Sequence, residues 1–438
     1  DARAQAIPIF QFAVFYDEDL EISPGPHMDI RGRIHTNAEL WVDGGTGLYM
    51  HDVVTVAGDL HLEFKGSGSS DGLENFIGLN DGSWADVLVD THNFGGDHDP
   101  NTFPSEAQDQ AFDDHSKATW DHNIQTRASG VEPLRLPIPE GVEPYELVEP
   151  CSGSEDASLA AIKYACNAGL TIRVRGTELE VLAGGAPIVL NPGAVAFDVN
   201  KFFDDREQSS NSGNGQPSAT NGNSDRDVIE VNLLMFPTPD YQNGIFYVTA
   251  DPTNPGGPDA AADERQYVVR IRNGMELQRP LTIATNLPMY VQGDYNTILG
   301  NWQPSSLVAD ALTILSNDWL DGAAGEDARP NASVNTTIKA AVLAGHTPSD
   351  LGGQGGGQFE NFPRFLETFG GGRTVAFTGS FASLWFAQYT NSQWACCNYY
   401  DPPVRDWNFE DRFLDPENLP PGTPTVGQVL RMGFARRY

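Results

Sequence analysis

Lysine is scarce in this chain: only five of its 438 residues are lysines, and 26 basic residues stand against 60 acidic ones. The formal net charge is −34. A surface of this sign repels phosphate backbones and anionic lipid, so the composition argues against nucleic acid as a partner. Divalent cations, a saline environment or a basic partner fit the charge, and so does plain solubility of an exposed protein.

Long apolar runs are also missing. No stretch of about 18 apolar residues occurs, so we expect no membrane span in this sequence. The apolar start, AIPIFQFAVFY from Ala6, is short and favours a buried strand over a signal peptide. With 45 glycines, 30 prolines and 39% apolar residues, the composition is typical of a loop-rich β protein.

Cysteine is rare, and no CxxC or CxxCH spacing occurs, which excludes the common zinc and haem motifs. Cys151 and Cys166 flank a predicted helix, and a helix of about a dozen residues would separate them by roughly 18 Å. A disulfide needs Cα atoms within about 7 Å. The two can therefore bond only if the helix is short and the chain doubles back; otherwise each pairs with Cys396 or Cys397. Disulfides would indicate export, and free buried thiols are the alternative.

A seven-residue pattern recurs instead: apolar, any, apolar, any, Gly, any, apolar. It fits four stretches, namely MDIRGRI from Met28, VTVAGDL from Val54, MYVQGDY from Met289 and VAFTGSF from Val375. Alternate apolar residues line one face of a strand, and the glycine permits a corner. The first two copies start 26 residues apart, a plausible coil length. We therefore predict a mainly β fold, a right-handed parallel β-helix (β-solenoid) with long loop insertions and a few short helices; a β-sandwich is the alternative.

The distribution of strand-like and polar segments divides the chain into five stretches. They are 1–65, the first solenoid rungs; 66–150, a polar insertion and linker; 151–170, a short helix; 171–390, further rungs; and 391–438, an aromatic and proline-rich cap with a basic tail. Four loops interrupt the second set of rungs: 207–227, 252–264, 320–333 and 351–358. Further helices are expected near Ser105 and in NFPRFLETF from Asn361.

Several blocks resemble the PilX-like large surface proteins encoded with type IV pilus genes. The quoted blocks are FQFAVFYDEDLEISPGPHMDIRGRIHTNAELWV from Phe10, EPLRLPIP, MYVQGDYN, ENFPRFLETF and YYDPPVRDWNFEDRFLDPENLPPGTP. Members typically carry a pilin-like membrane helix ahead of this part. The resemblance implies a place, the cell surface or an extracellular fibre, and supplies no catalytic residues. GRIHTN and VTVAGDL are also similar to bactofilin-like polymers, which favours a structural role.

Two polar loops are candidate calcium sites, because alternating oxygen side chains converge on one ion and calcium takes six to eight oxygens. One is NGNSDRD, and the other is DHDPN. Their predicted ligands are Asn221, Asn223, Asp225 and Asp227 in the first and Asp97, Asp99 and Asn101 in the second. A flexible polar loop and a glycine-proline turn are the respective alternatives.

The sequence thus predicts an exported, non-enzymatic structural or adhesive component of a cell-surface fibre associated with type IV pili. Other fibre subunits, copies of the chain itself and a polysaccharide or cell-surface ligand are the expected partners. A polysaccharide lyase or glycoside hydrolase is the alternative, since β-helices often carry such activity and two carboxylates about 5 to 10 Å apart suffice for hydrolysis. The aromatic residues near the end are expected to cap the solenoid rather than to bind sugar.

Overall fold

The computed structural model describes residues 2–65, 74–89, 106–176, 178–204, 211–212, 216–217, 225–236, 242–251, 267–321, 331–349, 357–390 and 402–431. Within these residues the protein is mainly β and contains several sheets, which confirms the predicted class. No described helix is both long and apolar enough to cross a membrane.

The first part of the chain runs through three sheets in turn. Its strands are β2 (Val14–Tyr16), β3 (Leu20–Ile22), β4 (Met28–Ile30), β5 (Ile34–Thr36), β6 (Leu40–Val42), β7 (Leu48–Met50), β8 (Val54–Val56), β9 (Leu60–His61), β10 (Asn75–Gly78), β11 (Trp84–Asp86) and β12 (Ile124–Gln125). The order β2-β5-β8-β12 belongs to one sheet, β3-β6-β9 to a second and β4-β7-β10-β11 to a third. We call this part the N-terminal stack.

Along β2 to β9 of the N-terminal stack, the offset between paired residues is 20, not 26. Val14 pairs with Ile34, which pairs with Val54, in parallel. Leu20 and Leu40 repeat the same offset on the next sheet. MDIRGRI and VTVAGDL are therefore not equivalent positions of successive coils, since the former begins at β4 and the latter at β8 on a different sheet.

The second part alternates strictly between two sheets. In one lie β20 (Ile245–Asp251), β22 (Leu281–Thr285), β24 (Ser305–Ala309), β26 (Thr336–Ala344) and β28 (Thr374–Ser383); in the other lie β19 (Asp225–Asn232), β21 (Tyr267–Arg272), β23 (Met289–Gln292), β25 (Leu312–Leu315) and β27 (Pro363–Phe365). Neighbours within each sheet pair in parallel, unlike the antiparallel sheets of a typical sandwich. We call this part the C-terminal stack. At its far end lie β13 (Leu170–Arg175), β14 (Glu178–Ala183), β15 (Ala186–Pro187) and β16 (Val195–Phe203). The short strands β17 (Asn211–Ser212) and β18 (Gln216–Pro217) form a separate antiparallel pair.

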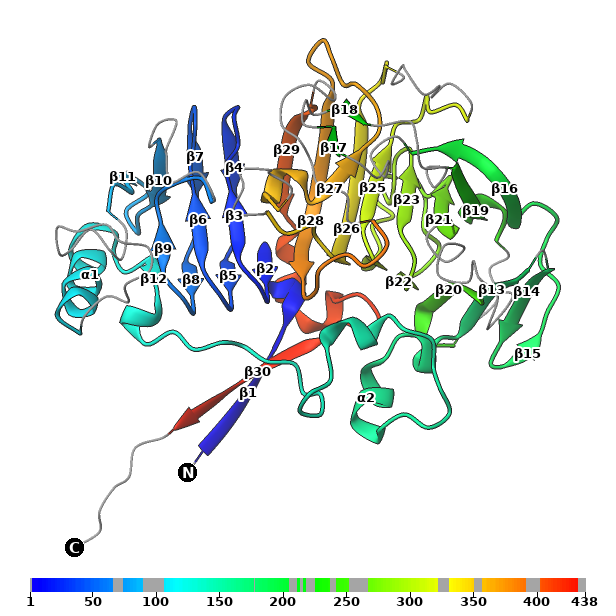
Figure 1. Cartoon of the computed structure of the whole chain (residues 1–438), viewed down its shortest axis with the longest axis horizontal. Helices are drawn as coiled ribbons and strands as arrows, with labels where there is room; N and C mark the ends of the chain where they lie inside the picture. Colours follow the sequence, from blue (N-terminus) through cyan, green and yellow to red (C-terminus); the bar gives the residue numbers. More distant parts are fainter. Residues whose placement is uncertain are drawn as a thin grey trace, which may run out of the picture.

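The two stacks share one sheet. Val14 of β2 pairs in parallel with Phe381 of β28, so a 13-stranded sheet runs from β12 at one end to β15 at the other. The other half of β28 pairs with β29 (Val404–Phe409). We call this meeting of β2, β28 and β29 the joint. From β2 at the joint the chain winds outward to β12 and returns by a connector, residues 126–169, that runs along the body to β13 (Figure 1).

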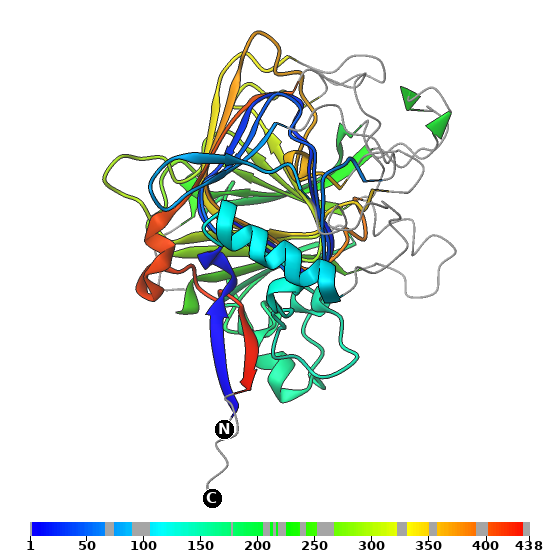
Figure 2. The ribbon, with the colours of Figure 1, turned by 90° about the vertical axis from the view of Figure 1, so that its left-hand side faces the viewer.

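The ends of the shared sheet are closed by segments other than the expected C-terminal cap. Helix α1 (Glu106–Thr119) lies across the end of the N-terminal stack (Figure 2), and Phe112 and Trp120 are buried in the main core there. At the opposite end β13 and β14 form an antiparallel hairpin. Of the predicted aromatic cap, the described residue Trp407 lies at the joint, where it packs edge-on against Phe359. Residues 391–401 and the basic tail from 432 lie outside the described residues.

Two glycines of the seven-residue pattern are required for different reasons. One lies at a corner between strands, and the other lies inside a strand. A Cβ on Gly58 would lie 2.6 Å from Glu39 Oε1 and 2.7 Å from the carbonyl oxygen of Ala38, so this corner requires glycine. Gly379 lies inside the ten-residue strand β28, where a Cβ would collide with the carbonyl oxygen of Ala340 on β26. Close approach of two strands, not a bend, explains that glycine.

Within the described part of the chain the helices are few, and most of them are short. They are α1, α2 (Ala157–Ile162), and the 3-10 turns η1 (Ile9–Gln11), η3 (Arg127–Ser129), η4 (Pro144–Leu147), η5 (Ala165–Asn167), η7 (Leu233–Met235), η8 (Gln242–Gly244), η9 (Phe359–Asn361), η10 (Asp411–Leu414) and η11 (Pro416–Asn418). The helix expected in NFPRFLETF is wrong: Pro363–Phe365 form β27, because their side chains are buried beside β25. Both chain ends leave through an antiparallel ribbon of β1 (Ala2–Pro8) and β30 (Thr425–Arg431), which projects from the body (Figure 1).

Candidate functional site

The outer surface of the third sheet carries a row of aromatic side chains. Strands β4 and β7 bury their first and third residues and leave the middle one partly exposed. The register places Asp29 beside Tyr49 and Tyr49 beside Phe76. Trp84 of β11 lies opposite Gly78, two residues along β10 from Phe76, and therefore on the same side. We call the surface formed by His27, Asp29, Tyr49, His51, Phe76 and Trp84 the ring face.

The rings of this face contact one another. Tyr49 and Phe76 are stacked, with centroids 4.5 Å apart and planes at 19°. Trp84 stands edge-on to Tyr49 at 5.0 Å and edge-on to His51 at 4.7 Å. His27 lies 5.0 Å from Tyr49. Each ring therefore limits the rotamers of its neighbours, and the surface is ordered before any ligand arrives.

Asp29 joins the two histidines of the ring face. His51 Nε2 lies 2.5 Å from Asp29 Oδ1, and His27 Nε2 lies 2.8 Å from Oδ2. Partial burial opposes ionisation of Asp29, but the hydrogen bonds from His51 and His27 outweigh it and lower the pKa of the carboxyl. Asp29 is thus a carboxylate at neutral pH, held between two imidazoles on a surface of otherwise apolar rings.

A second aromatic contact lies on the neighbouring sheet. Trp41 of β6 and His61 of β9 occupy equivalent positions of successive coils and stack with centroids 3.8 Å apart and planes at 11°. His61 Nε2 also lies 2.9 Å from Glu39 Oε2. These contacts join two successive coils on the outer surface of the sheet next to the ring face.

Acidic side chains form a ladder at the corner that precedes the second sheet. The carboxylate of Asp19 accepts the backbone N–H of Glu39 at 3.1 Å, and that of Glu39 accepts the backbone N–H of Asp59 at 2.7 Å. Each end has a basic partner: Lys65 Nζ lies 2.9 Å from Asp19, and Arg127 Nε lies 2.9 Å from Asp59. Part of the acidity thus serves to join coils.

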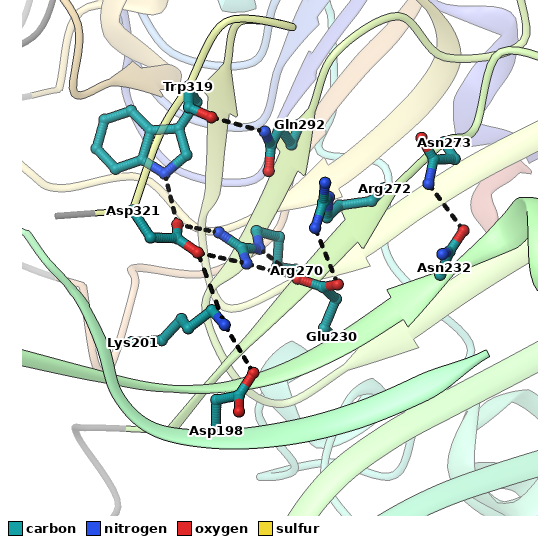
Figure 3. A network of polar contacts seen from close by, with 10 residues as sticks. All are labelled: Asp198, Lys201, Glu230, Asn232, Arg270, Arg272, Asn273, Gln292, Trp319 and Asp321. Carbon is teal, nitrogen blue, oxygen red and sulfur yellow. Dashed lines mark hydrogen bonds and ion pairs between the residues drawn. The ribbon is translucent and has the colours of Figure 1, made fainter. Parts of the chain in front are cut away.

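A different polar network covers the outer face of the C-terminal stack (Figure 3). Its centre is Arg270 of β21, whose side chain is 1% exposed. The guanidinium donates to Glu230 on β19 and, through both Nη atoms at 2.5 and 3.0 Å, to Asp321. Arg272, two residues along the strand and 40% exposed, lies 3.1 Å from the same Glu230. The buried charge of Arg270 is therefore matched by two carboxylates.

This network attaches a neighbouring segment to the sheet. Lys201 bonds Asp198 at 2.9 Å and lies 3.9 Å from Asp321, while the indole N–H of Trp319 donates to Asp321 at 3.0 Å (Figure 3). Beneath it Phe202 packs edge-on against Trp319. Every charge named here is neutralised by a partner, so the arrangement holds a strand end in place rather than presenting a reactive group.

A pair of buried carboxyls lies beside the joint. Glu21 accepts the hydroxyl of Ser349 at 2.7 Å and lies 3.5 Å from Lys65; burial raises its pKa, with Lys65 opposing the shift. Burial raises the pKa of Glu360 to about 7, although Arg405 opposes this. The Tyr16 hydroxyl is buried nearby with no hydrogen-bond partner among the described residues. Both carboxyls are buried.

The predicted calcium ligands are only partly within the described residues. Asn221, Asn223, Asp97, Asp99 and Asn101 lie outside them. Asp225 is exposed at the start of β19, and Asp227 follows two residues later on the same side of that strand. Asp227 is buried and accepts the backbone N–H of Asn200 at 2.8 Å. Calcium binding at either loop therefore stays a prediction.

The cysteines follow the first of the two expected routes. Cys151 and Cys166 form a disulfide with Cα atoms 5.0 Å apart, because helix α2 has only six residues and the chain doubles back around it. Cys396 and Cys397 lie outside the described residues. Among the described residues, Cys151, Glu155 and Cys166 are the group close enough together to hold a metal ion. The disulfide occupies both sulfurs, so this group is no metal site.

The ring face was missed in the sequence because its members come from four strands. A signal did exist: the repeats DEDLEI, NAELWV and AGDLHL are 20 residues apart and each puts an acidic residue before leucine. Aligning the chain on that period would have placed Asp29 and Tyr49 one above the other.

Comparisons with known proteins do not assign the chain to a family. No protein-family model matches the chain, and no curated protein matches it. Among solved structures, one similar chain is the competence-associated pilin ComZ from Thermus thermophilus, with 12% identity and a TM-score of 0.36, over 98% of this chain and 78% of that chain. A TM-score this low supports neither a shared fold nor a shared role.

Proposed function

We propose that this protein is an exported, non-enzymatic structural or adhesive component of a cell-surface fibre, associated with type IV pili. The observation that carries the proposal is the Cys151–Cys166 disulfide, since such bonds form and persist mainly in oxidising compartments outside the cytosol. The strongly acidic composition, with net charge −34, fits a protein exposed to solvent and ions.

The architecture supports a structural role. We interpret the two stacks as one right-handed parallel β-helix, because successive strands return in parallel to the same sheets and parallel crossovers are nearly always right-handed. In such a fold each coil contacts only its neighbours. A stack that shares one 13-stranded sheet is a stiff body suited to a fibre or its tip.

The link to type IV pili rests on the sequence blocks that resemble PilX-like proteins. Although far apart in the chain, several of these blocks meet around the joint. Asn37 of the first block bonds the backbone N–H of Leu134 at 2.7 Å, and Glu360 accepts the backbone N–H of Ser23 at 3.2 Å. Arg405 donates to the carbonyl oxygen of Glu360 at 3.0 Å. Four of the five blocks are thus connected by contacts in the fold.

Immunogold labelling of intact cells, together with fractionation of sheared surface material, tests this proposal. We expect the protein on the cell surface and in the pilus-containing fraction, and absent from both in a strain lacking the pilus assembly genes. A cytoplasmic enzyme serves as the lysis control. Recovery only with that enzyme would contradict export, and release of reducing sugar from a polysaccharide would contradict the non-enzymatic part.

Calcium is a separate part of the proposal. Sedimentation of the purified protein with calcium and then with chelator, at moderate and high salt, measures whether the ion promotes self-association. We expect larger particles with calcium and their loss in an Asp225→Asn variant. A sedimentation coefficient indifferent to calcium would remove the ion from the proposal.

A further inference from the structure

We infer that the ring face binds a neutral carbohydrate chain. The inference deepens the adhesive role and rests on it, by naming the class of ligand. Its starting point is the exposure of the rings: Trp84 is 39% exposed, and Tyr49 and Phe76 are partly exposed beside it. The solvent-exposed face of a sheet usually carries polar side chains, so a continuous row of aromatic rings on that face is unusual.

The size of the face argues for a small or linear ligand. It spans four strands of three or four residues. With strands about 4.8 Å apart and about 3.3 Å per residue, this is roughly 15 by 12 Å, or under about 200 Å². A stable protein partner typically buries about 800 Å² on each side. The ring face is therefore too small for a protein interface but matches a few sugar units.

The chemistry of the face fits a sugar ring. One side of a pyranose is a patch of C–H groups, which are weakly positive and pack on the negative face of an aromatic ring. The edges carry hydroxyls, which need donors and acceptors. The Asp29 carboxylate supplies an acceptor, and its partners His27 and His51 supply ring nitrogens; their side chains are 34%, 56% and 24% exposed.

The negative charge of the protein favours neutral sugars over acidic ones. A net charge of −34 repels uronic acids and sulfated chains. Asp29 itself would lie against the ligand as an anion. A neutral polysaccharide is repelled neither by the net charge of the protein nor by the Asp29 carboxylate. We therefore assign neutral hexose polymers as the ligand class.

Binding of cellohexaose, laminarin and dextran to the purified full chain, followed by tryptophan fluorescence and calorimetry, tests the inference, with alginate as the acidic comparison. We expect binding of at least one neutral probe and none of alginate. Trp84→Ala and Asp29→Asn should each weaken that binding at least tenfold. Phe386→Ala, which removes a ring of similar exposure (37%) away from this face, should leave it unchanged.

Three outcomes would overturn the inference: no binding of any neutral probe, binding of alginate alone, or neutral binding that Trp84→Ala and Asp29→Asn leave intact. Circular dichroism and melting curves confirm that both variants fold, and Asp29→Asn, which removes no ring, is the remaining test if Trp84→Ala proves unstable. Because the measurement uses purified protein, failure here leaves the surface location standing, whereas failure of the labelling experiment leaves sugar binding standing.

Discussion

Glu39 accepts the backbone N–H of Asp59, 20 residues later, at 2.7 Å. The donor belongs to the corner of the next coil, where the side chain of Asp59 takes the equivalent position. A side chain thus satisfies a backbone donor that the turn between two strands leaves outside the sheet. Acidic residues at this corner act as links between coils, and their charge is a consequence of that task.

Glu39→Ala should lower the free energy of unfolding by about 1 to 2 kcal/mol, because it leaves the Asp59 N–H without its acceptor. His61 also loses its partner, 2.9 Å away. Urea unfolding followed by circular dichroism measures the effect. The exposed Glu140→Ala is the control and should change stability by less than about 0.5 kcal/mol. Equal values for the two variants would show that the corner bond contributes nothing.

Arg270→Leu should destabilise the protein by about 3 kcal/mol or more, because Glu230 and Asp321 would keep their partly buried charges without the guanidinium between them. Arg272→Leu is the matched control. It removes an exposed partner of the same Glu230 and should cost less than about 1 kcal/mol. Both are measured by denaturant unfolding, and a larger loss for Arg272→Leu would refute the central role of Arg270.

Glu360 should make stability fall as the pH rises. Burial raises its pKa from 4.5 to about 7, so between these values the folded protein holds a proton that the unfolded chain has lost. The contribution is present below pH 4.5 and is lost as the pH rises through about 7. Glu360→Gln stays neutral and should remove this part of the slope between pH 5 and 7.5.

The comparison between variant and native protein is essential in that experiment. Burial lowers the pKa of His35 to about 4 and that of His346 to about 3. These two groups act in the opposite sense, since their contribution is lost as the pH falls below 6.5. Only the difference between the two unfolding profiles reports on Glu360. A difference that is flat across the range would mean that Glu360 is ionised throughout.

Replacing both Cys151 and Cys166 with serine should lower stability by about 3 kcal/mol, because the bond closes a loop of 15 residues in the unfolded chain. Peptide mapping without reduction should recover Cys151 linked to Cys166. A peptide joining either one to Cys396 or Cys397 would contradict the pairing. The doubly substituted variant should still bind sugar, since the ring face lies on other strands.

Gly379→Ala should destabilise the protein by at least about 2 kcal/mol, because a methyl group there meets the Ala340 carbonyl and forces β26 and β28 apart. Gly153→Ala, where a Cβ meets open space, is the control and should be close to neutral. Thermal melting of the two variants side by side measures the contrast. Similar melting temperatures would show that the two strands separate without cost.

The local rules of the sequence were sufficient to predict a mainly β protein. Alternation in VTVAGDL predicts a short strand with Val54 and Val56 inward, and both are fully buried. The corner at Gly58 was also foreseen. The period was not, because MDIRGRI and VTVAGDL match the same pattern while belonging to different sheets.

Partners far apart in the chain could not be predicted. Nothing in Val14 or its neighbours indicates that β28, more than 360 residues later, lies beside it. The ring face has the same difficulty, since an insertion separates Tyr49 from Phe76. The predicted calcium ligands relied on spacing within loops, of which the structure describes only Asp225 and Asp227.

The pairing of β2 with β28 at the joint also affects folding during synthesis. The ribosome makes β2 long before its partner strand, since Phe381 of β28 follows Val14 by more than 360 residues. Until residues 374–383 emerge, β2 presents an unpaired edge, which is the part of a sheet most prone to pair with another chain. That edge must therefore stay shielded or unfolded until β28 has been made, and the pairing of β28 with β2 is the step that covers it.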